Sequence, residues 1–533
     1  MKTRLTYFVC MLLFFCCPVR AQEDRHAHAH HEMNDLGKVD FATSCSPAVQ
    51  KSFERGVALL HSFWYEAAQA QFEDVLHNDP HCAMAQWGVA MSLYHPLWDR
   101  PGAEILTKGR AALDTAASAG EKTPREKEYI AALAIFYKGT ESGDHLARAA
   151  DYAKAMEQVY FHYPQDREAA IFYALSLLGS EPPRDPGFTT RMKAAAVLEN
   201  VFKEAPDHPG VAHYLIHSYD RPQLASQGLA AARAYAKIAP AAPHALHMPS
   251  HIFNRVGLWQ ETIASNLASV AATRKSAMEH MGDASHQLHA LDYLSYAYLQ
   301  IGREADAVKI LDEVKALSGM EPAEMNYMLT ELPARYALEM RHWTEAAALV
   351  APAESRPGAS AILYRGRVIG NARIGNAAKA REDLKQLEAF QQAAHQSVAG
   401  YPAAEKDVDW QEAKAWVEYA EGNVDQALRD MRATADLEEK DGPAQLAIPA
   451  REMLAEMLLE KNRTAEALAE YEGALRVAPG RFGGLYGAAR AAEMAGKSQQ
   501  AANYYAQLLK NCDGGAHSDR PELKQARALV AKR

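Results

Sequence analysis

The sequence predicts an all-α protein folded as a right-handed solenoid of helical hairpins. The chain has 533 residues, which is too long for one compact core and suits several domains or one extended array. Alanine is frequent and β-branched residues rarely cluster, which favours helices over strands. Ala467 and Tyr471 recur 34 residues later as Ala501 and Tyr505. A hairpin of this length cannot bury its apolar face alone, so neighbouring hairpins must stack.

Residues 1–21 are predicted to be a signal peptide. Lys2 and Arg4 form a basic start, an apolar run follows over residues 5–17, and residues 19–21 resemble a cleavage site. The apolar run is too short to span a bilayer, and no later segment reaches the length and apolarity of a membrane span. We therefore expect the mature chain to be exported, to the periplasm or beyond the cell.

The charge of the chain restricts its partners. The formal net charge is −10, and it becomes −13 without the three basic residues of the signal peptide. Such an acidic chain is not attracted to phosphate backbones or anionic lipid, which excludes nucleic-acid binding. The partner that we expect is a protein or a peptide. The oligomeric state does not follow from the sequence.

Residues 22–46 are predicted to form a flexible leader, because they are polar and rich in histidine and glutamate. Histidine tracts of this kind bind Cu, Ni or Zn loosely, so the leader would serve as a metal-gathering arm. Its closely spaced histidines are His26, His28, His30 and His31.

Two cysteines flank the first repeats. Cys45 and Cys82 each precede a predicted helix of neighbouring repeats. They can form a disulfide if their Cα atoms come within about 7 Å. The alternative is that both are small buried residues. Cys512 is then left without an internal partner in an oxidising compartment.

Residues 47–315 and 316–511 are predicted to form two arrays, followed by a tail over 512–533. The 34-residue period, with small residues at the helix crossing and proline after the second helix, resembles the tetratricopeptide repeat (TPR) pattern. Three strings also resemble a group of exported bacterial TPR proteins: CAMAQWGVAM, VAHYLIHSYD and HMPSHIF. The resemblance implies a concave groove lined by the second, fifth, ninth, twelfth and thirteenth residues of each first helix. It implies no activity.

Local signals define further elements. Residues 123–126 (Thr-Pro-Arg-Glu) form a capping box with proline at the first helical position, which predicts a helix over 126–138. Helix formation should fail in the loop over 179–186 and in breaks near 352–360 and 400–404, which contain glycine and proline.

The implied register gives the early repeats an apolar groove lining. Three alternatives fit it: an apolar ligand pocket, a copper site with thioether ligands, or ordinary packing between helices. The residues assigned to this lining, with one from a later repeat, are Met84, Trp87, Met91, Tyr94, His95 and Tyr296; Trp98 lies just beyond.

Histidines gather in the middle of the chain. Nine of the 22 lie between His208 and His289. The register predicts that six of them and two aspartates face one groove: His213, His217, His244, His247, His251, His289, Asp220 and Asp292. Histidines four apart share a helix face, and adjacent helices pack about 8–10 Å apart, so their imidazoles can meet at a metal. Three histidines with an aspartate suit Zn, Fe(II) or Cu(II). The aspartate can instead orient an imidazole.

Pro249 lies among these histidines and admits two interpretations. It can kink a helix that carries His244, His247 and His251, because proline interrupts a helix interior. Alternatively, the helix starts near Pro249, and His244 and His247 lie in the preceding loop, which would weaken their inward assignment.

Two functions remain open from the sequence. The first is an exported scaffold that holds a peptide, a protein or a small ligand in its groove. The second is a metal-binding protein whose ion is structural, carried or catalytic. Without a metal, the histidine groove would charge as pH falls through about 6.5 and bind an acidic ligand. The chain lacks a phosphate-binding glycine loop, an HExxH motif and a nucleophile elbow around Ser250.

Overall fold

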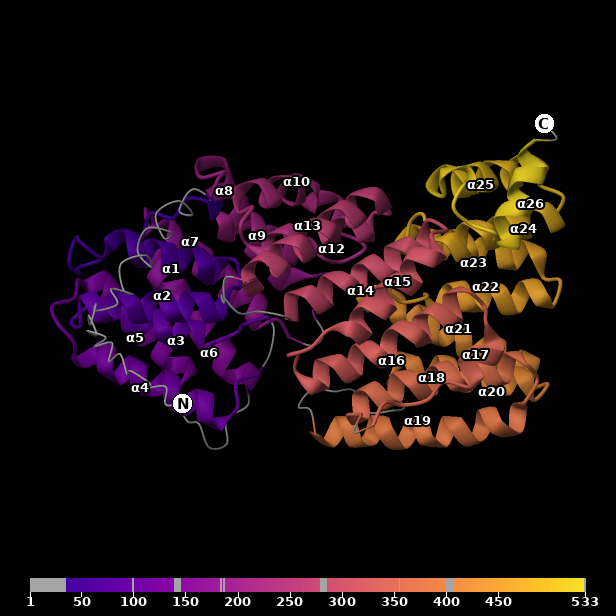
Figure 1. Cartoon of the computed structure of the whole chain (residues 1–533), viewed down its shortest axis with the longest axis horizontal. Coiled ribbons are helices and arrows are strands. Elements are labelled where there is room, and N and C mark those ends of the chain that lie inside the picture. Colours follow the sequence, from indigo (N-terminus) through magenta and orange to yellow (C-terminus); the bar gives the residue numbers. More distant parts are fainter. Residues whose placement is uncertain are drawn as a thin grey trace, which may run out of the picture.

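The computed structural model describes residues 35–97, 100–138, 145–182, 185, 187–278, 285–353, 355–397 and 407–531. Within these ranges the secondary structure is entirely helical, and consecutive helices pack side by side along an elongated array (Figure 1). The all-α prediction is confirmed. The predicted signal peptide, the leader histidines and Trp98 lie outside the described residues. In the described part of the chain, no helix is both long and apolar enough to cross a membrane.

The first half of the array holds twelve helices. They are α1 (Gln50–His61), α2 (Tyr65–Asn78), α3 (Ala83–Ser92), α4 (Ala103–Ser118), α5 (Pro124–Phe136), α6 (His145–His162), α7 (Arg167–Gly179), α8 (Thr189–Glu204), α9 (Pro209–Tyr219), α10 (Leu229–Ile238), α11 (Pro243–His247) and α12 (Pro249–Arg255). The predicted capping box starts α5, where the Thr123 side chain accepts from the Glu126 amide and Glu126 accepts from the Thr123 amide.

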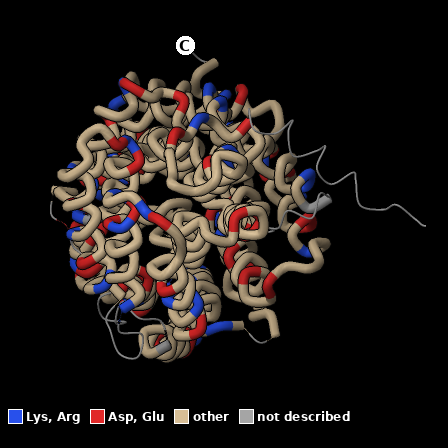
Figure 2. Tube along the Cα trace, turned by 90° about the vertical axis from the view of Figure 1, so that its left-hand side faces the viewer, with Lys and Arg blue, Asp and Glu red and all other residues tan. Residues whose placement is uncertain are grey.

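The second half continues in the same manner. Its helices are α13 (Trp259–Met278), α14 (Ser285–Gln300), α15 (Glu304–Ala316), α16 (Pro322–Glu339), α17 (Trp343–Ala347), α18 (Pro357–Arg373), α19 (Ala377–Ser397), α20 (Val408–Ala420), α21 (Val424–Asp441), α22 (Ala450–Glu460), α23 (Thr464–Val477), α24 (Phe482–Met494), α25 (Ser498–Asn511) and α26 (Pro521–Val530). Seen from the N-terminal end, charges of both signs are interspersed along the helices (Figure 2).

Glycines let the helices of a hairpin approach closely. The Phe72 ring of α2 lies between Gly56 of α1 and Gly88 of α3. A Cβ atom at Gly88 would lie 2.5 Å from that ring, closer than any real carbon contact. The missing side chains thus make room for an aromatic core residue.

The structure differs from the predicted flexible leader over residues 35–46. Leu36 and Phe41 are fully buried. The Phe41 ring contacts Trp87 and Tyr129, with centroids 5.8 and 5.2 Å apart. Because an aromatic side chain buries a large apolar area, Phe41 holds its segment between the helices of the first repeats.

Cys45 and Cys82 form a disulfide. This bond attaches the N-terminal segment to the residue that precedes α3. Cys512 is a free and buried thiol.

Segments that are far apart in the sequence contact each other around α13 and α14. The Trp259 indole donates to the Gly480 carbonyl over 3.0 Å. Gly257 has φ +72°, and a side chain there would collide with the Pro479 carbonyl, so glycine is required on both counts. Arg481 is fully buried beside α14 and donates to the Tyr296 hydroxyl over 2.7 Å.

Candidate metal centre

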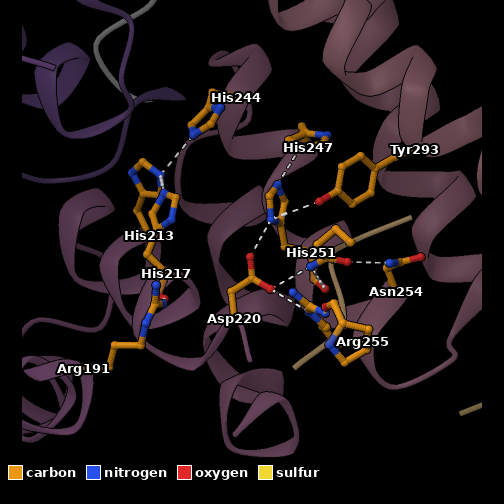
Figure 3. A network of polar contacts seen from close by, with 12 residues as sticks. Arg191, His213, His217, Asp220, His244, His247, His251, Asn254, Arg255 and Tyr293 are labelled. Carbon is orange, nitrogen blue, oxygen red and sulfur yellow. Dashed lines mark hydrogen bonds and ion pairs between the residues drawn. The ribbon is translucent and has the colours of Figure 1, made fainter. Parts of the chain in front are cut away.

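Six of the histidines assigned to the groove converge, as two groups of three. Each group offers one ring nitrogen per residue, and these nitrogens lie within 4.8 Å of one another. The 213 triad is His213, His217 and His244, and the 247 triad is His247, His251 and His289. Helices α9, α11, α12 and α14 supply the six residues. In Figure 3 the 213 triad lies on one side, His247 and His251 lie on the other, and Asp220 lies between and below them.

Pro249 lies at a break between two consecutive helices, and the residues before it are helical. Helix α11 ends at His247, Met248 keeps helical dihedral angles, and α12 begins at Pro249. Of the two interpretations, the kinked helix is therefore the one that the structure contains. His244 and His247 are helical and buried, and both turn toward the other imidazoles.

His213 has a fixed tautomer. Its Nδ1 lies 2.6 Å from the His61 carbonyl oxygen, and because a carbonyl only accepts, that nitrogen carries the proton. The lone pair of the neutral ring is then on Nε2. This atom lies 3.1 Å from Nε2 of His217 and 3.1 Å from Nε2 of His244.

His247 is oriented in the same way by Asn266. The Asn266 amide nitrogen donates to the Thr262 carbonyl over 2.8 Å, so its oxygen faces His247. That oxygen accepts from His247 Nδ1 over 2.6 Å. The lone pair of His247 is therefore on Nε2, which lies 3.0 Å from Nε2 of His251.

Asp220 orients His251 and is not placed as a metal ligand. Its Oδ2 accepts from His251 Nδ1 over 2.9 Å. Its Oδ1 accepts from Arg255 over 3.1 Å and from Gln445 over 2.7 Å. Burial raises the pKa of Asp220, but Arg255 and His251 outweigh burial and hold that pKa well below its usual range. A carboxylate that fixes an imidazole through Nδ1 is a common support of metal-binding histidines.

The buried imidazoles stay neutral at physiological pH. Burial, reinforced by the neighbouring imidazoles, lowers the pKa of His217 and of His289 to about 3. The same causes hold the pKa values of His213, His244 and His247 well below 6.5. The prediction that this groove charges near pH 6.5 was therefore wrong for these five residues, because it treated them as solvated. A neutral imidazole is the form that binds a metal.

Asp292 does not join either triad. It is buried, and its Oδ1 accepts from Arg335 over 2.5 Å. An ion pair with arginine satisfies this carboxylate, so the predicted ligand role of Asp292 is not supported by its position.

The apolar groove lining predicted for the early repeats is a packed core. Met84, Trp87, Met91 and Tyr94 have at most 1% of their surface exposed. His95 stacks on Tyr65, with ring centroids 4.0 Å apart. Tyr296, from the later repeat, is also buried and accepts from Arg481. This arrangement is packing between helices, with Phe41 against Trp87.

A second buried cluster supports the 213 triad and was not predicted. Glu168 accepts from His61 Nε2 over 2.9 Å and from His208 Nε2 over 2.8 Å. Burial raises the pKa of Glu168, but His208 and His61 outweigh it and keep this carboxylate ionised. Burial lowers the pKa of His61. His208 belongs to the histidine-rich stretch, but nothing in the sequence connects it to His61.

Comparisons with known proteins are limited to fold. No family model and no curated protein matches the chain. Similar solved structures include the APC/C hetero-tetramer Cut9-Hcn1 (10% identity, 77% of this chain and 76% of that chain, TM-score 0.36). A tetratricopeptide repeat protein from Parabacteroides merdae is 13% identical over 69% of this chain and 99% of that chain, with a TM-score of 0.25. Yeast Tom70 is 9% identical over 90% of this chain and 94% of that chain, with a TM-score of 0.33. At these scores they support no statement about function. The described residues form an array of stacked helical hairpins.

Proposed function

We propose that this protein is a helical-repeat scaffold that binds a transition-metal ion at the 247 triad. One observation carries the proposal: Nε2 of His247 and Nε2 of His251 lie 3.0 Å apart. Both rings donate their Nδ1 protons elsewhere, to Asn266 and to Asp220. Two neutral rings would then direct lone pairs at each other, which is repulsive. A cation between the two nitrogens turns that repulsion into attraction.

A metal ion fits this position better than a proton does. A proton bridges two nitrogens, whereas a ring nitrogen of His289 also lies within 4.8 Å of the other two. Ligands at 2.0–2.1 Å from a tetrahedral ion are about 3.3 Å apart, close to the observed spacing. Arg255 already balances the charge of Asp220, so the carboxylate does not require an imidazolium.

The ligand set selects the class of metal. Three imidazoles, without thiolate or carboxylate ligands, suit Zn or Cu and disfavour Mg, Ca and Mn. Three protein ligands also leave one position of a tetrahedral ion open, as in catalytic sites. Asn266 and Asp220 fix the ring orientations, which raises affinity for the ion.

Protein binding and export are further parts of the proposal. TPR-type arrays typically bind protein partners on their surfaces. In this chain Phe41 fills the space at the first repeats, so a peptide would bind elsewhere on the array. Export through residues 1–21 is supported by the Cys45–Cys82 disulfide, because disulfides persist in oxidising compartments.

Metal content measured by mass spectrometry tests the proposal. The sample is the full chain without an affinity tag, incubated with Zn or Cu and freed of excess metal. Alanine replaces the leader histidines, so that they do not contribute: His26, His28, His30 and His31. We expect bound metal, and one ion per chain fewer in the His247→Ala, His251→Ala variant.

A matched control removes two exposed histidines that are also four apart, His77 and His81. The His77→Ala, His81→Ala variant should keep its full metal content. A metal-free parent chain would refute the proposal, as would a His247→Ala, His251→Ala variant that retains all of its metal while remaining folded by circular dichroism.

A further inference from the structure

We propose that the 213 triad binds a second ion and that the two ions form one dinuclear centre. The inference rests on the proposed function, because it adds a second ion beside the ion of the 247 triad. Helix α11 connects the two triads, since His244 belongs to one and His247 to the other. No other described helix contributes to both.

The two triads are adjacent. The ring centroids of His244 and His247 are 6.2 Å apart, and those of His217 and His251 are 6.5 Å apart. Both ions would be about 2.0–2.1 Å from their own Nε2 atoms. Under this proposal the two ions share a small bridging ligand and couple magnetically.

The 213 triad has the features of a built site. His213 Nε2 faces the nitrogens of both other rings, and its Nδ1 is held by the His61 carbonyl. Behind it, His61 Nε2 donates to Glu168, and the Tyr214 hydroxyl lies 3.0 Å from His61 Nδ1. This support fixes one ring orientation, as hydrogen-bonded partners of metal ligands do.

Phe63 supplies an independent observation. It has φ +54°, a conformation that is strained for a bulky residue and persists where the surroundings impose it. In this conformation its buried ring lies against all three imidazoles of the triad. The centroid distances are 4.3 Å to His213, 5.4 Å to His244 and 5.6 Å to His217. The strained residue thus forms one wall of the second site.

The charge balance indicates the ligand of the centre. Imidazole ligands do not compensate the charge of two divalent ions, and both oxygens of Asp220 are already engaged. A small anion such as hydroxide or a carboxylate would therefore bridge the ions. A cavity of about 340 Å³ reaches His217, and Arg100, Arg191 and Glu181 are among its lining residues. Glu181 pairs with Arg191 over 2.6 Å, so Arg100 is the lining cation that favours the entry of an anion.

Copper loading tests the inference. With Cu(II), the full chain lacking its leader histidines should bind two ions per chain. Its integrated electron paramagnetic resonance signal should correspond to far fewer than two unpaired spins per chain, because the two ions couple. The His213→Ala, His217→Ala variant and the His247→Ala, His251→Ala variant should each bind one copper ion and give one full, uncoupled spin.

Other outcomes separate the two proposals. One copper ion per parent chain, or two with a full two-spin signal, would overturn the dinuclear centre and leave single-site metal binding intact. A copper-free parent would overturn both.

Azide, a small bridging anion, should bind the loaded parent more tightly than either variant, by on the order of tenfold or more, because two ions hold it at once. Equal azide affinity in all three proteins would exclude a bridged centre.

Discussion

At the scale of single residues, hydrogen bonds decide what each imidazole can do. Three oxygens each accept a hydrogen bond from the Nδ1–H of an imidazole: the His61 carbonyl, the Asn266 amide oxygen and the Asp220 carboxylate. The lone pairs that remain converge at Nε2, which is the arrangement a metal requires. The sequence predicted which histidines face inward, but it contained no signal for the residues that hold their tautomers, with Asp220 as the exception.

The depressed pKa values of His217 and His289 predict a pH dependence of stability. Both rings have a pKa of about 3 when folded, against an ordinary value of 6.5. As pH falls below 6.5, the unfolded chain binds protons that the folded chain does not, so the free energy of unfolding decreases down to about pH 3. Urea unfolding of the metal-free chain at a series of pH values measures this.

The His217→Gln, His289→Gln variant is the comparison for that measurement. Glutamine does not titrate, so the decrease in stability between pH 6.5 and 3 should be smaller in this variant. An unchanged slope would show that other groups cause the acid sensitivity. The metal-loaded chain should show a steeper decrease, because protons then compete with the bound ion for the ligands.

At the scale of helices, the hairpins depend on small residues at close approaches. Gly88 of α3 has no side chain to separate it from the Phe72 ring of α2. The period of small residues in the sequence predicted such crossings, because glycine and alanine recur where helices meet. The break at Pro249 was also visible in the sequence, but only the packed neighbours decided that the helical path continues beyond it.

Gly88→Ala should therefore destabilise the chain. Alanine gains about 1 kcal/mol of helix propensity over glycine, but its Cβ would overlap Phe72, and overpacking costs about 1–3 kcal/mol. We expect a lower midpoint in urea unfolding. Gly358→Ala is the matched control, because Gly358 also lies in a helix and has no atom within 4 Å of an added Cβ. Equal midpoints for the two variants would contradict this account.

At the scale of the whole molecule, contacts distant in sequence join the two halves. Gln445 lies 225 residues beyond Asp220 and donates to it, so the second half of the array helps to orient His251. Within the second half, Arg481 is buried and pairs with Glu339 and Glu452 over 2.8 and 2.9 Å. The two halves are thus coupled through the contact of Gln445 with Asp220.

Arg481→Ala should destabilise the second half of the array. The substitution leaves the buried Glu339 and Glu452 carboxylates without their cation, and breaking a buried pair in this way costs about 3–5 kcal/mol. Calorimetry should show a lower melting temperature, whereas the control Arg476→Ala, at an exposed position, should melt like the parent. A variant as stable as the parent would mean that the second half is stable without this network.

The sequence alone determined the helical hairpins, the small residues at their crossings and the six histidines that share one region. These features are local: they follow from periodicities of a few residues and from a repeat of 34. Only the tertiary structure decided that Met84 and Trp87 are core residues and that the histidines form two triads. It also supplied the supports of the site, since His61 lies 152 residues from His213. Contacts across such separations depend on how the array closes in space, and no local pattern of residues records that.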